Sequence, residues 1–457
     1  MSSDLSKEVI LKQGATVNIT VKENTESGNV VPNALVRIQS EDGILDYITE
    51  TTEGGMISTH LLNDSYTFTI EKDGYSKAVV TKDILDNINA ITFVISKVYN
   101  VTANVTKTSE PVPDATVNVW EGSQDSVISQ ILSEMGCVLF KRTGDKAGTF
   151  IRLDENTRLK YFDGSVAKTD GTEGDVMVYL PEYYYRYENL GGTKFVYRFS
   201  RVNLGEDWIH VPASLIGAYK GYVSSKKLYS RSRVTPKGDI SFNNATTYSE
   251  ARGTGYQIID YYQHCQIAML FYAKYRNRHS QAVLGIGGAE YNTKTGGTDA
   301  LGNRDTEKAS SGWVNFRGIE GVFGGLEEYV KGVIINNNVW SITNLDNSVR
   351  TVKAYSSRGY ISHIQAEKGP FFDVIPTSIQ SQEQLGEDYC AYYYTMGSEE
   401  MILSRSGAHA VEDGSIAYTY ANDSTTSIGY TKGSRLAFRG ELTESKDVNS
   451  FKEIIAV

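Results

Sequence analysis

Cysteine is scarce in this chain: Cys137, Cys265 and Cys390 are its three cysteines, and they stand far apart among 457 residues. None belongs to a C-x-x-C pair, and an odd, sparse set does not describe a disulfide framework or a zinc site. We therefore expect buried free thiols. The sequence predicts no metal site and no cofactor.

Positive charge is also in short supply, because 45 Lys and Arg stand against 55 Asp and Glu, for a formal net charge of −10. Phosphate contacts need a basic surface, so this balance disfavours nucleic-acid binding and docking on anionic lipid. No run approaches the ~18–20 apolar residues that span a bilayer, and no signal peptide is visible. We expect no nucleic-acid partner and no membrane insertion. Work outside a cell would require export by another route, such as assembly into a particle.

Catalytic signatures are absent in the same way. The chain has no G-x-S-x-G elbow, no H-E-x-x-H and no G-x-x-x-x-G-K-[ST], and its six His residues form no spaced cluster. Adjacent Glu327 and Glu328 are interpreted as a solvated or capping pair, since neighbouring carboxylates seldom converge on one substrate. We predict no catalytic residue and expect that the chain is not an enzyme.

Tyrosine, in contrast, is abundant, with 31 residues beside 4 Trp. Tyr, Ser, Gly and Asn make adaptable binding surfaces, because Tyr offers a large amphipathic contact area at low entropy cost. Tyr also fills half-buried positions in β-sheets. We expect both roles, in different parts of the chain.

Residues 8–97 alternate polar and apolar side chains with a period of two, and polar turns separate the runs. This pattern predicts an all-β sandwich module over 1–97. A strand leading to Val31-Pro32-Asn33-Ala34 is echoed by one leading to Val112-Pro113-Asp114-Ala115, which predicts a second, partial β module or connector at 98–124. These segments resemble the Ig-like and carboxypeptidase-regulatory-like modules of bacterial surface proteins and phage fibres.

Helical periodicity and dense aromatics appear after residue 124. Residues 126–135 have apolar side chains at helical spacing, and 255–275 form the strongest predicted helix, with a stripe that includes Ile258 and Ile259. His264 lies in the middle of that helix. No partner stands at metal-ligand spacing, so His264 is interpreted as a core or surface residue.

Five motifs follow one another in the second part of the chain, and they include residues 170–188, 208–213, 318–333 and 433–440. In this order they resemble the C-type-lectin-fold domain of phage tail-fibre and receptor-binding proteins. They are similar too to retroelement-diversified variable proteins and, more distantly, to formylglycine-generating enzymes. The resemblance implies a multidomain chain in which a mixed α+β C-type-lectin-like domain occupies 125–457.

Such domains present a ligand-binding face built from the last loop-rich segment before a final core strand. By resemblance the strand is 434–439, with Leu436 and Phe438 in the core, and the segment 404–430 lies on the outer face. The implied ligand-binding residues are Ser404, Ser406, Ala408, His409, Glu412, Asp413, Ser415, Tyr418, Tyr420, Asn422 and Asp423, with Trp340 in a second patch.

Different roles are expected within this set. Tyr418 and Tyr420 would supply stacking area for a sugar ring or an apolar patch, whereas Asp413, Asn422 and Asp423 would orient the ligand by hydrogen bonds. For the second patch, Asn336–Asn338 with Trp340, a plain hairpin turn with a buried Trp is the open alternative.

The residues and the resemblance together predict a non-enzymatic receptor-binding protein, an adhesin of a phage tail or virion that recognises a host cell-surface glycan or protein. The N-terminal β module would contact other virion proteins, and a homo-oligomer, specifically a trimer, is expected. A bacterial cell surface is the alternative location. Two other functions stay open: a structural decoration or baseplate protein, and a formylglycine-generating-type enzyme, for which Cys390 lacks the second cysteine that the mechanism needs.

Overall fold

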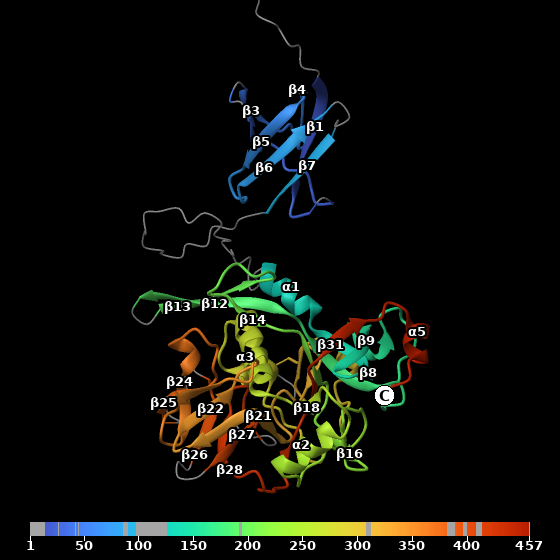
Figure 1. Cartoon of the computed structure of the whole chain (residues 1–457), viewed down its shortest axis with the longest axis vertical. Helices are drawn as coiled ribbons and strands as arrows, with labels where there is room; N and C mark the ends of the chain where they lie inside the picture. Colours follow the sequence, from blue (N-terminus) through green and yellow to red (C-terminus); the bar gives the residue numbers. More distant parts are fainter. Residues whose placement is uncertain are drawn as a thin grey trace, which may run out of the picture. The chain divides into compact units, whose positions relative to one another are not determined.

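The computed structural model divides the chain into two compact units, Met1–Asp125 and Ser126–Val457, here called the N-terminal and the C-terminal unit (Figure 1). The predicted connector at 98–124 lies outside the residues that the structure describes. Those residues are 14–25, 27–41, 43, 45–85, 90–96, 126–191, 194–307, 312–381, 389–395, 400–407 and 414–456.

Two small sheets make up the described part of the N-terminal unit. One has the order β4-β1-β7, with β1 antiparallel to β4 and parallel to β7. The other has the order β3-β2-β5-β6 and is antiparallel. The strands are β1 (Gly14–Glu23), β2 (Leu35–Ser40), β3 (Asp46–Glu50), β4 (Met56–Leu62), β5 (Asp64–Glu71), β6 (Ala78–Ile84) and β7 (Ala90–Ile95).

One apolar core joins these two sheets. The alternation along β1 turns Val17, Ile19 and Val21 inward, and all three are fully buried. Phe68 of β5 meets Phe93 of β7, in the other sheet, with 5.1 Å between ring centroids. The predicted period of two is confirmed for β1, β2, β4, β5 and β7 but not for β3 and β6, whose side chains are mostly exposed or half-buried. Burial of the shared core holds the two sheets together.

Replacing Phe68 by alanine is expected to lower the free energy of unfolding of the N-terminal unit by about 3–5 kcal/mol, because the lost ring leaves a cavity. The C-terminal unit has its own core and should keep its melting temperature. Calorimetry of the full chain should therefore show one shifted transition. Equal shifts in both transitions would show that the two units unfold together.

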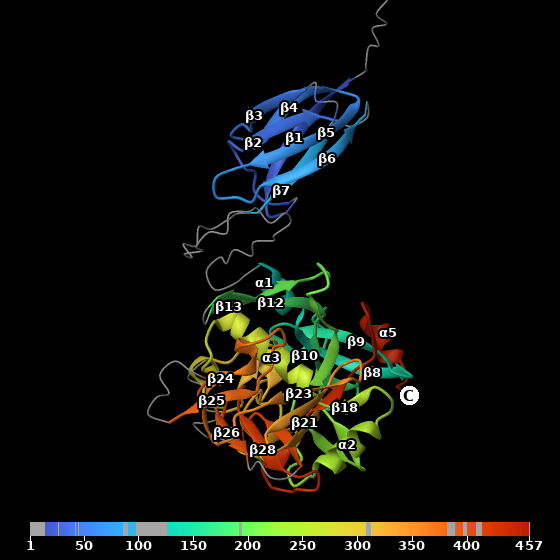
Figure 2. The same cartoon turned by 60° about the vertical axis from the view of Figure 1, so that its left-hand side comes forward.

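Two large sheets dominate the C-terminal unit (Figure 1 and Figure 2). Sheet I has the order β10-β9-β8-β11-β15-β30-β18, with β31 beside β9. Its strands are β8 (Gly136–Gly144), β9 (Ala147–Asp154), β10 (Thr157–Tyr161), β11 (Asp175–Leu180), β15 (Ser214–Gly217), β18 (Tyr256–Ile258), β30 (Leu436–Phe438) and β31 (Glu441–Glu444).

Sheet II has the order β23-β22-β21-β27-β28-β26-β24-β25, with β29 beside β21. Sheet II thus places β27 between two other strands, and it contains residues 404–405 and 419–423 of the segment predicted to bind a ligand. Its strands are β21 (Glu327–Asn336), β22 (Val339–Thr343), β23 (Val349–Lys353), β24 (Gly359–Ile364), β25 (Pro376–Gln380), β26 (Tyr392–Thr395), β27 (Met401–Arg405), β28 (Thr419–Asp423) and β29 (Lys432–Gly433).

Smaller elements complete the C-terminal unit. One small sheet is β13-β12-β14, and two hairpins are β16-β17 and β19-β20. The chain is thus mostly β, with several sheets and few helices in its described part. These elements are β12 (Tyr183–Gly191), β13 (Lys194–Ser200), β14 (Ile209–Val211), β16 (Tyr222–Ser224), β17 (Lys227–Tyr229), β19 (Asn315–Phe316), β20 (Ile319–Glu320), α1 (Ser126–Glu134), α2 (Phe242–Glu250), α3 (Tyr261–Tyr275), α4 (Ser280–Leu284), α5 (Val448–Glu453) and the 3-10 turns η1 (Asp299–Leu301) and η2 (Gln365–Glu367).

The longest helix, α3, begins later than its apolar stripe predicts. Asp260 forms a capping box with Gln263: its carboxylate accepts from the Gln263 backbone N–H at 2.9 Å, and the Gln263 side chain accepts from the Asp260 backbone N–H at 3.1 Å. Such a box fixes the first turn. Ile258 belongs instead to β18, where it pairs with Leu436. The prediction of a helix from residue 255 is wrong for its first six residues, whereas the predicted helix at 126–135 is confirmed as α1.

The strand predicted near the C-terminus is present as β30. Leu436 and Phe438 are fully buried, and β30 pairs with β15 on one side and β18 on the other. The expected core position is confirmed. It is not the last strand, however, because β31 follows and pairs with β9. Within the described ranges no helix has the length and apolar character to cross a bilayer.

Candidate functional site

Six of the eight predicted binding residues that the structure describes are buried. Tyr420 and Asn422 of β28 are half-buried. Ala408, His409, Glu412 and Asp413 lie outside the described residues. The expectation of an outer face is wrong for five residues, each less than 9% exposed: Ser404, Ser406, Ser415, Tyr418 and Asp423. Trp340, from the second predicted patch, is buried too.

The burial of this segment follows from the position of β27 inside sheet II. β27 pairs with β21 on one side and β28 on the other. Arg405, the last residue of β27, is 1% exposed. Its guanidinium donates to the Thr419 hydroxyl and to the carbonyl oxygen of Val374. Residues 404–407 and 414–419 of the predicted loop are thereby part of the core, because a buried cation must use its hydrogen-bond donors within the protein.

The second predicted patch is a tight turn above a buried ring. Asn336 pairs with Val339 across the β21–β22 hairpin, and Asn337 and Asn338 have φ values of 47° and 61°. Asn accepts this left-handed backbone more readily than most residues. Trp340 is fully buried, so the alternative of a hairpin turn with a buried Trp describes this region.

A row of tyrosines crosses three neighbouring strands of sheet II. Tyr360 of β24 pairs with Tyr392 of β26, and Tyr394 of β26 pairs with Tyr420 of β28. Ring centroids along the row are 5.0, 4.4 and 5.3 Å apart. All four side chains are half-buried, whereas Tyr393 points to the opposite face and is fully buried. These four rings, called the tyrosine row, give one face of the sheet an aromatic surface.

Lys432 lies at the Tyr420 end of the row. Its ammonium is 3.4 Å from the ring centroid of Tyr420, and it pairs with Glu327 at 2.5 Å and with Asp423 at 2.9 Å. Cation–π and carboxylate contacts together hold the ring in one place. Asn422, two residues after Tyr420 on β28, shares its face of the strand. Tyr420 and Asn422 are the predicted binding residues that belong to this surface.

Sequence reasoning did not find Tyr360, Tyr392 and Tyr394. The signal for two of them is the run Tyr392-Tyr393-Tyr394, since three aromatics in a short strand leave the first and third on one face. Tyr360 comes from a strand about thirty residues away, and only the pairing of β24 with β26 brings it to the row.

Glu327 and Glu328 form buried ion pairs, so their interpretation as a solvated or capping pair is wrong. Because consecutive strand residues point to opposite faces, the two carboxylates have different partners. Glu328 is 1% exposed and accepts from Lys220 at 2.6 Å and from Arg435 at 2.7 Å, while Glu327 meets Lys432. Burial by itself raises the pKa of the Glu328 carboxyl, but Arg435 and Lys220 outweigh burial and hold that pKa well below 4.5.

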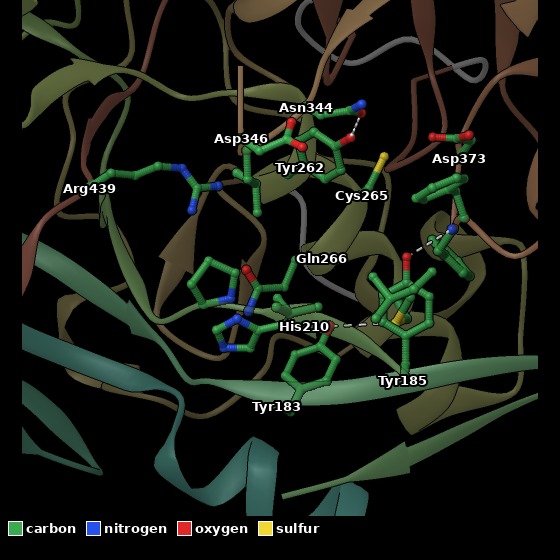
Figure 3. Close-up of a pocket in the computed structure, with 17 residues that line it drawn as sticks. Tyr183, Tyr185, His210, Tyr262, Cys265, Gln266, Asn344, Asp346, Asp373 and Arg439 are labelled. Carbon is green, nitrogen blue, oxygen red and sulfur yellow. Dashed lines mark hydrogen bonds between the residues drawn. The ribbon is translucent and has the colours of Figure 1, made fainter. Parts of the chain in front are cut away.

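A cavity of about 300 Å³ lies beside α3 (Figure 3). Its walls come from β12, β14, α3, the turn between β22 and β23, and the segment before β25. Tyr183 and Tyr185 of β12 and Met269 of α3 line it, with Phe371 and Phe372. Most of its wall is therefore aromatic or apolar, which is usual for a small-molecule pocket.

The acidic and basic side chains that border this cavity accept or donate hydrogen bonds within the protein. Asp346 accepts from the backbone N–H of Ser348 at 2.9 Å and from its hydroxyl at 2.6 Å. Asp373 accepts from the Arg350 guanidinium at 2.7 and 2.6 Å. Arg439 donates to both carboxylate oxygens of Asp260, one of them at 2.9 Å. Cys265 is 5% exposed, and burial raises the pKa of its thiol to about 12, so the thiol is protonated at neutral pH. The expectation of buried free thiols is confirmed.

Metal ligands do not gather in the described residues: nowhere there do three His, Cys, Asp or Glu side chains group so that they could hold a metal ion.

No protein-family model and no curated protein matches the chain. Solved structures with local likeness include 3-chlorocatechol 1,2-dioxygenase from Rhodococcus opacus 1CP, at 10% identity over 21% of this chain and 63% of that one, with a TM-score of 0.17. Chlorocatechol 1,2-dioxygenase from Pseudomonas putida matches at 11% identity over 19% and 60%, with a TM-score of 0.16. The Bacillus anthracis TIE protein matches at 15% identity over 46% and 29%, with a TM-score of 0.17.

The chain spans less than two thirds of the length of each of these proteins. At such TM-scores the likeness assigns this chain neither a fold nor a reaction. The expectation that the chain is not an enzyme is corrected only to this extent: dioxygenases, which are enzymes, stand among the matching structures. The absence of known catalytic motifs from the sequence does not show that the chain lacks enzymatic activity.

Glu328→Gln is expected to lower the free energy of unfolding of the C-terminal unit by roughly 3–5 kcal/mol at neutral pH, because it leaves two buried cations without their carboxylate. The folded pKa of Glu328 lies below its unfolded value of 4.5. Its stabilisation is therefore fully present above that value and is lost as the pH falls through the folded pKa.

Denaturant unfolding of wild type and Glu328→Gln at neutral and at acid pH should show a difference that narrows in acid. The exposed Glu441, changed to Gln, is the matched control and should alter stability little at either pH. A wild-type advantage of the same size at both pH values would contradict an ionised Glu328.

Proposed function

We propose that the chain is a receptor-binding protein of a phage tail or virion and that the tyrosine row contacts a glycan of the host cell surface. The observation that carries this proposal is the row itself, four adjoining half-buried rings on one face of sheet II. Aromatic side chains at such positions offer a large contact area and lose little conformational entropy on binding.

The geometry of the row fits a saccharide. Tyr392 and Tyr394 project from one strand with 4.4 Å between ring centroids, so an extended ligand would meet both. The C–H faces of sugar rings are apolar and can cover aromatic surface, while their hydroxyls need hydrogen-bond partners. Asn422, on the same face as Tyr420, supplies a donor and an acceptor beside the rings.

The fold class proposed for the C-terminal unit is the C-type-lectin-like domain, preceded by an Ig-like module in the N-terminal unit. The order of the sequence motifs supports this proposal, as does the succession of a two-sheet β unit and a unit with both sheets and helices. The N-terminal unit would then attach to other virion proteins. Trimerisation would multiply weak single-site contacts through avidity.

The decisive variant is Tyr392→Ala with Tyr420→Ala, which removes two half-buried rings and leaves Tyr393 in the core. Binding of the labelled protein to a panel of bacterial strains, and to envelope glycans isolated from the strains bound, should weaken by about 30-fold or more, as for paired hot-spot residues. Tyr418 is unsuitable for this test, because it is 5% exposed and its loss would disturb the core.

Tyr222→Ala is the matched control, because Tyr222 is also half-buried but belongs to the β16–β17 hairpin. Its binding should equal that of wild type, and the circular dichroism of all variants should agree. Undiminished binding by the double variant would reject the tyrosine row. A chain that is found in particles yet binds no strain would favour a structural virion protein.

A further inference from the structure

The wall of the cavity beside α3 contains the side-chain amide of Gln266. Gln266 is 4% exposed. Its amide nitrogen donates to the Pro181 carbonyl oxygen at 3.1 Å, but no described residue donates to its own amide oxygen. Figure 3 shows that oxygen turned into the cavity, on the side of Arg439. A ligand in the cavity that carries an N–H or O–H can therefore reach this oxygen, and the hydrogen bond it makes there adds to its affinity.

The charges around the cavity disfavour an ionic ligand. Asp346 accepts two hydrogen bonds from Ser348. Asp373 accepts two hydrogen bonds from Arg350, and Arg439 donates two to Asp260. A ligand ion entering between them would lose its hydration and find these partners occupied. The Cys265 thiol is protonated and adds no charge.

Size and lining restrict the ligand further. About 300 Å³ is the lower end of the range for small-molecule pockets, so the cavity takes one ring or a fused pair of rings. Tyr183, Tyr185 and Phe372 offer aromatic edges and faces, and Met269 adds a thioether that packs well against aromatic rings.

The geometry points to a binding site for a small uncharged aromatic compound with one N–H or O–H donor, of the indole or phenol type. The ring fills the space between β12 and α3, and the donor bonds to the amide oxygen of Gln266. This site is separate from the tyrosine row, which belongs to β24, β26 and β28, and it does not depend on receptor binding.

The test compares indole with indene, which has the same shape but no N–H, by calorimetric titration of the full chain. Indole should bind about tenfold more tightly than indene, and phenol should bind while benzoate does not. Gln266→Met keeps the side-chain length and removes the acceptor, so the preference for indole over indene should vanish while indene still binds.

Met269→Trp is the second variant, because its larger side chain fills the cavity; it should abolish binding of both compounds. The melting temperature and circular dichroism of each variant establish that it is folded, and the Met269→Trp result stands alone if Gln266→Met does not fold. The proposal is overturned if wild type binds neither indole nor phenol, binds benzoate as well as phenol, or shows no preference for indole over indene. It is equally overturned if folded Met269→Trp binds indole as wild type does.

Discussion

The C-terminal unit depends on one buried carboxylate. Glu328, on β21 of sheet II, binds Lys220, which follows β15 of sheet I, and Arg435, which precedes β30 of the same sheet. Arg435 also donates to the carbonyl oxygens of Gly217 and Glu320 at 2.8 and 2.9 Å. The pairing thus joins the two large sheets at a site where neither cation can turn to water, which makes loss of the carboxylate costly.

A second buried charge, that of Arg405, fixes the strands of the tyrosine row. Arg405 pairs with no carboxylate of the described residues and donates instead to a hydroxyl and to backbone carbonyl oxygens. These bonds tie β27 to β28, and Lys432 ties β28 to β21 through Glu327. The half-buried rings therefore belong to strands that buried cations hold in place. A ligand that binds the rings would order this surface little further, so binding would cost little conformational entropy.

The features predicted correctly from the sequence are those that residues close together in the chain determine. The alternation predicted in the N-terminal unit is present in β1, β2, β4, β5 and β7, and Leu436 and Phe438 are core residues, because apolar periodicity reports burial directly. The prediction of an outer face at 404–430 failed for its buried residues because Ser404 and Arg405 give β27 a polar sequence. The pairing of β27 with β21, some 75 residues earlier, cannot be recognised from the neighbouring residues. The two adjacent glutamates likewise find partners about a hundred residues away. The tyrosine row and the cavity arise from such distant pairings, so their residues could not be grouped from the sequence.

The position of β30 has a consequence for biosynthesis. This three-residue strand lies between β15 and β18 in sheet I but follows them by roughly two hundred residues in the chain. While the ribosome is still adding residues before Leu436, both neighbours present unpaired edges, and sheet I cannot close until translation is nearly complete. A chain cut short before β30 would thus keep two open edges that invite pairing with other chains.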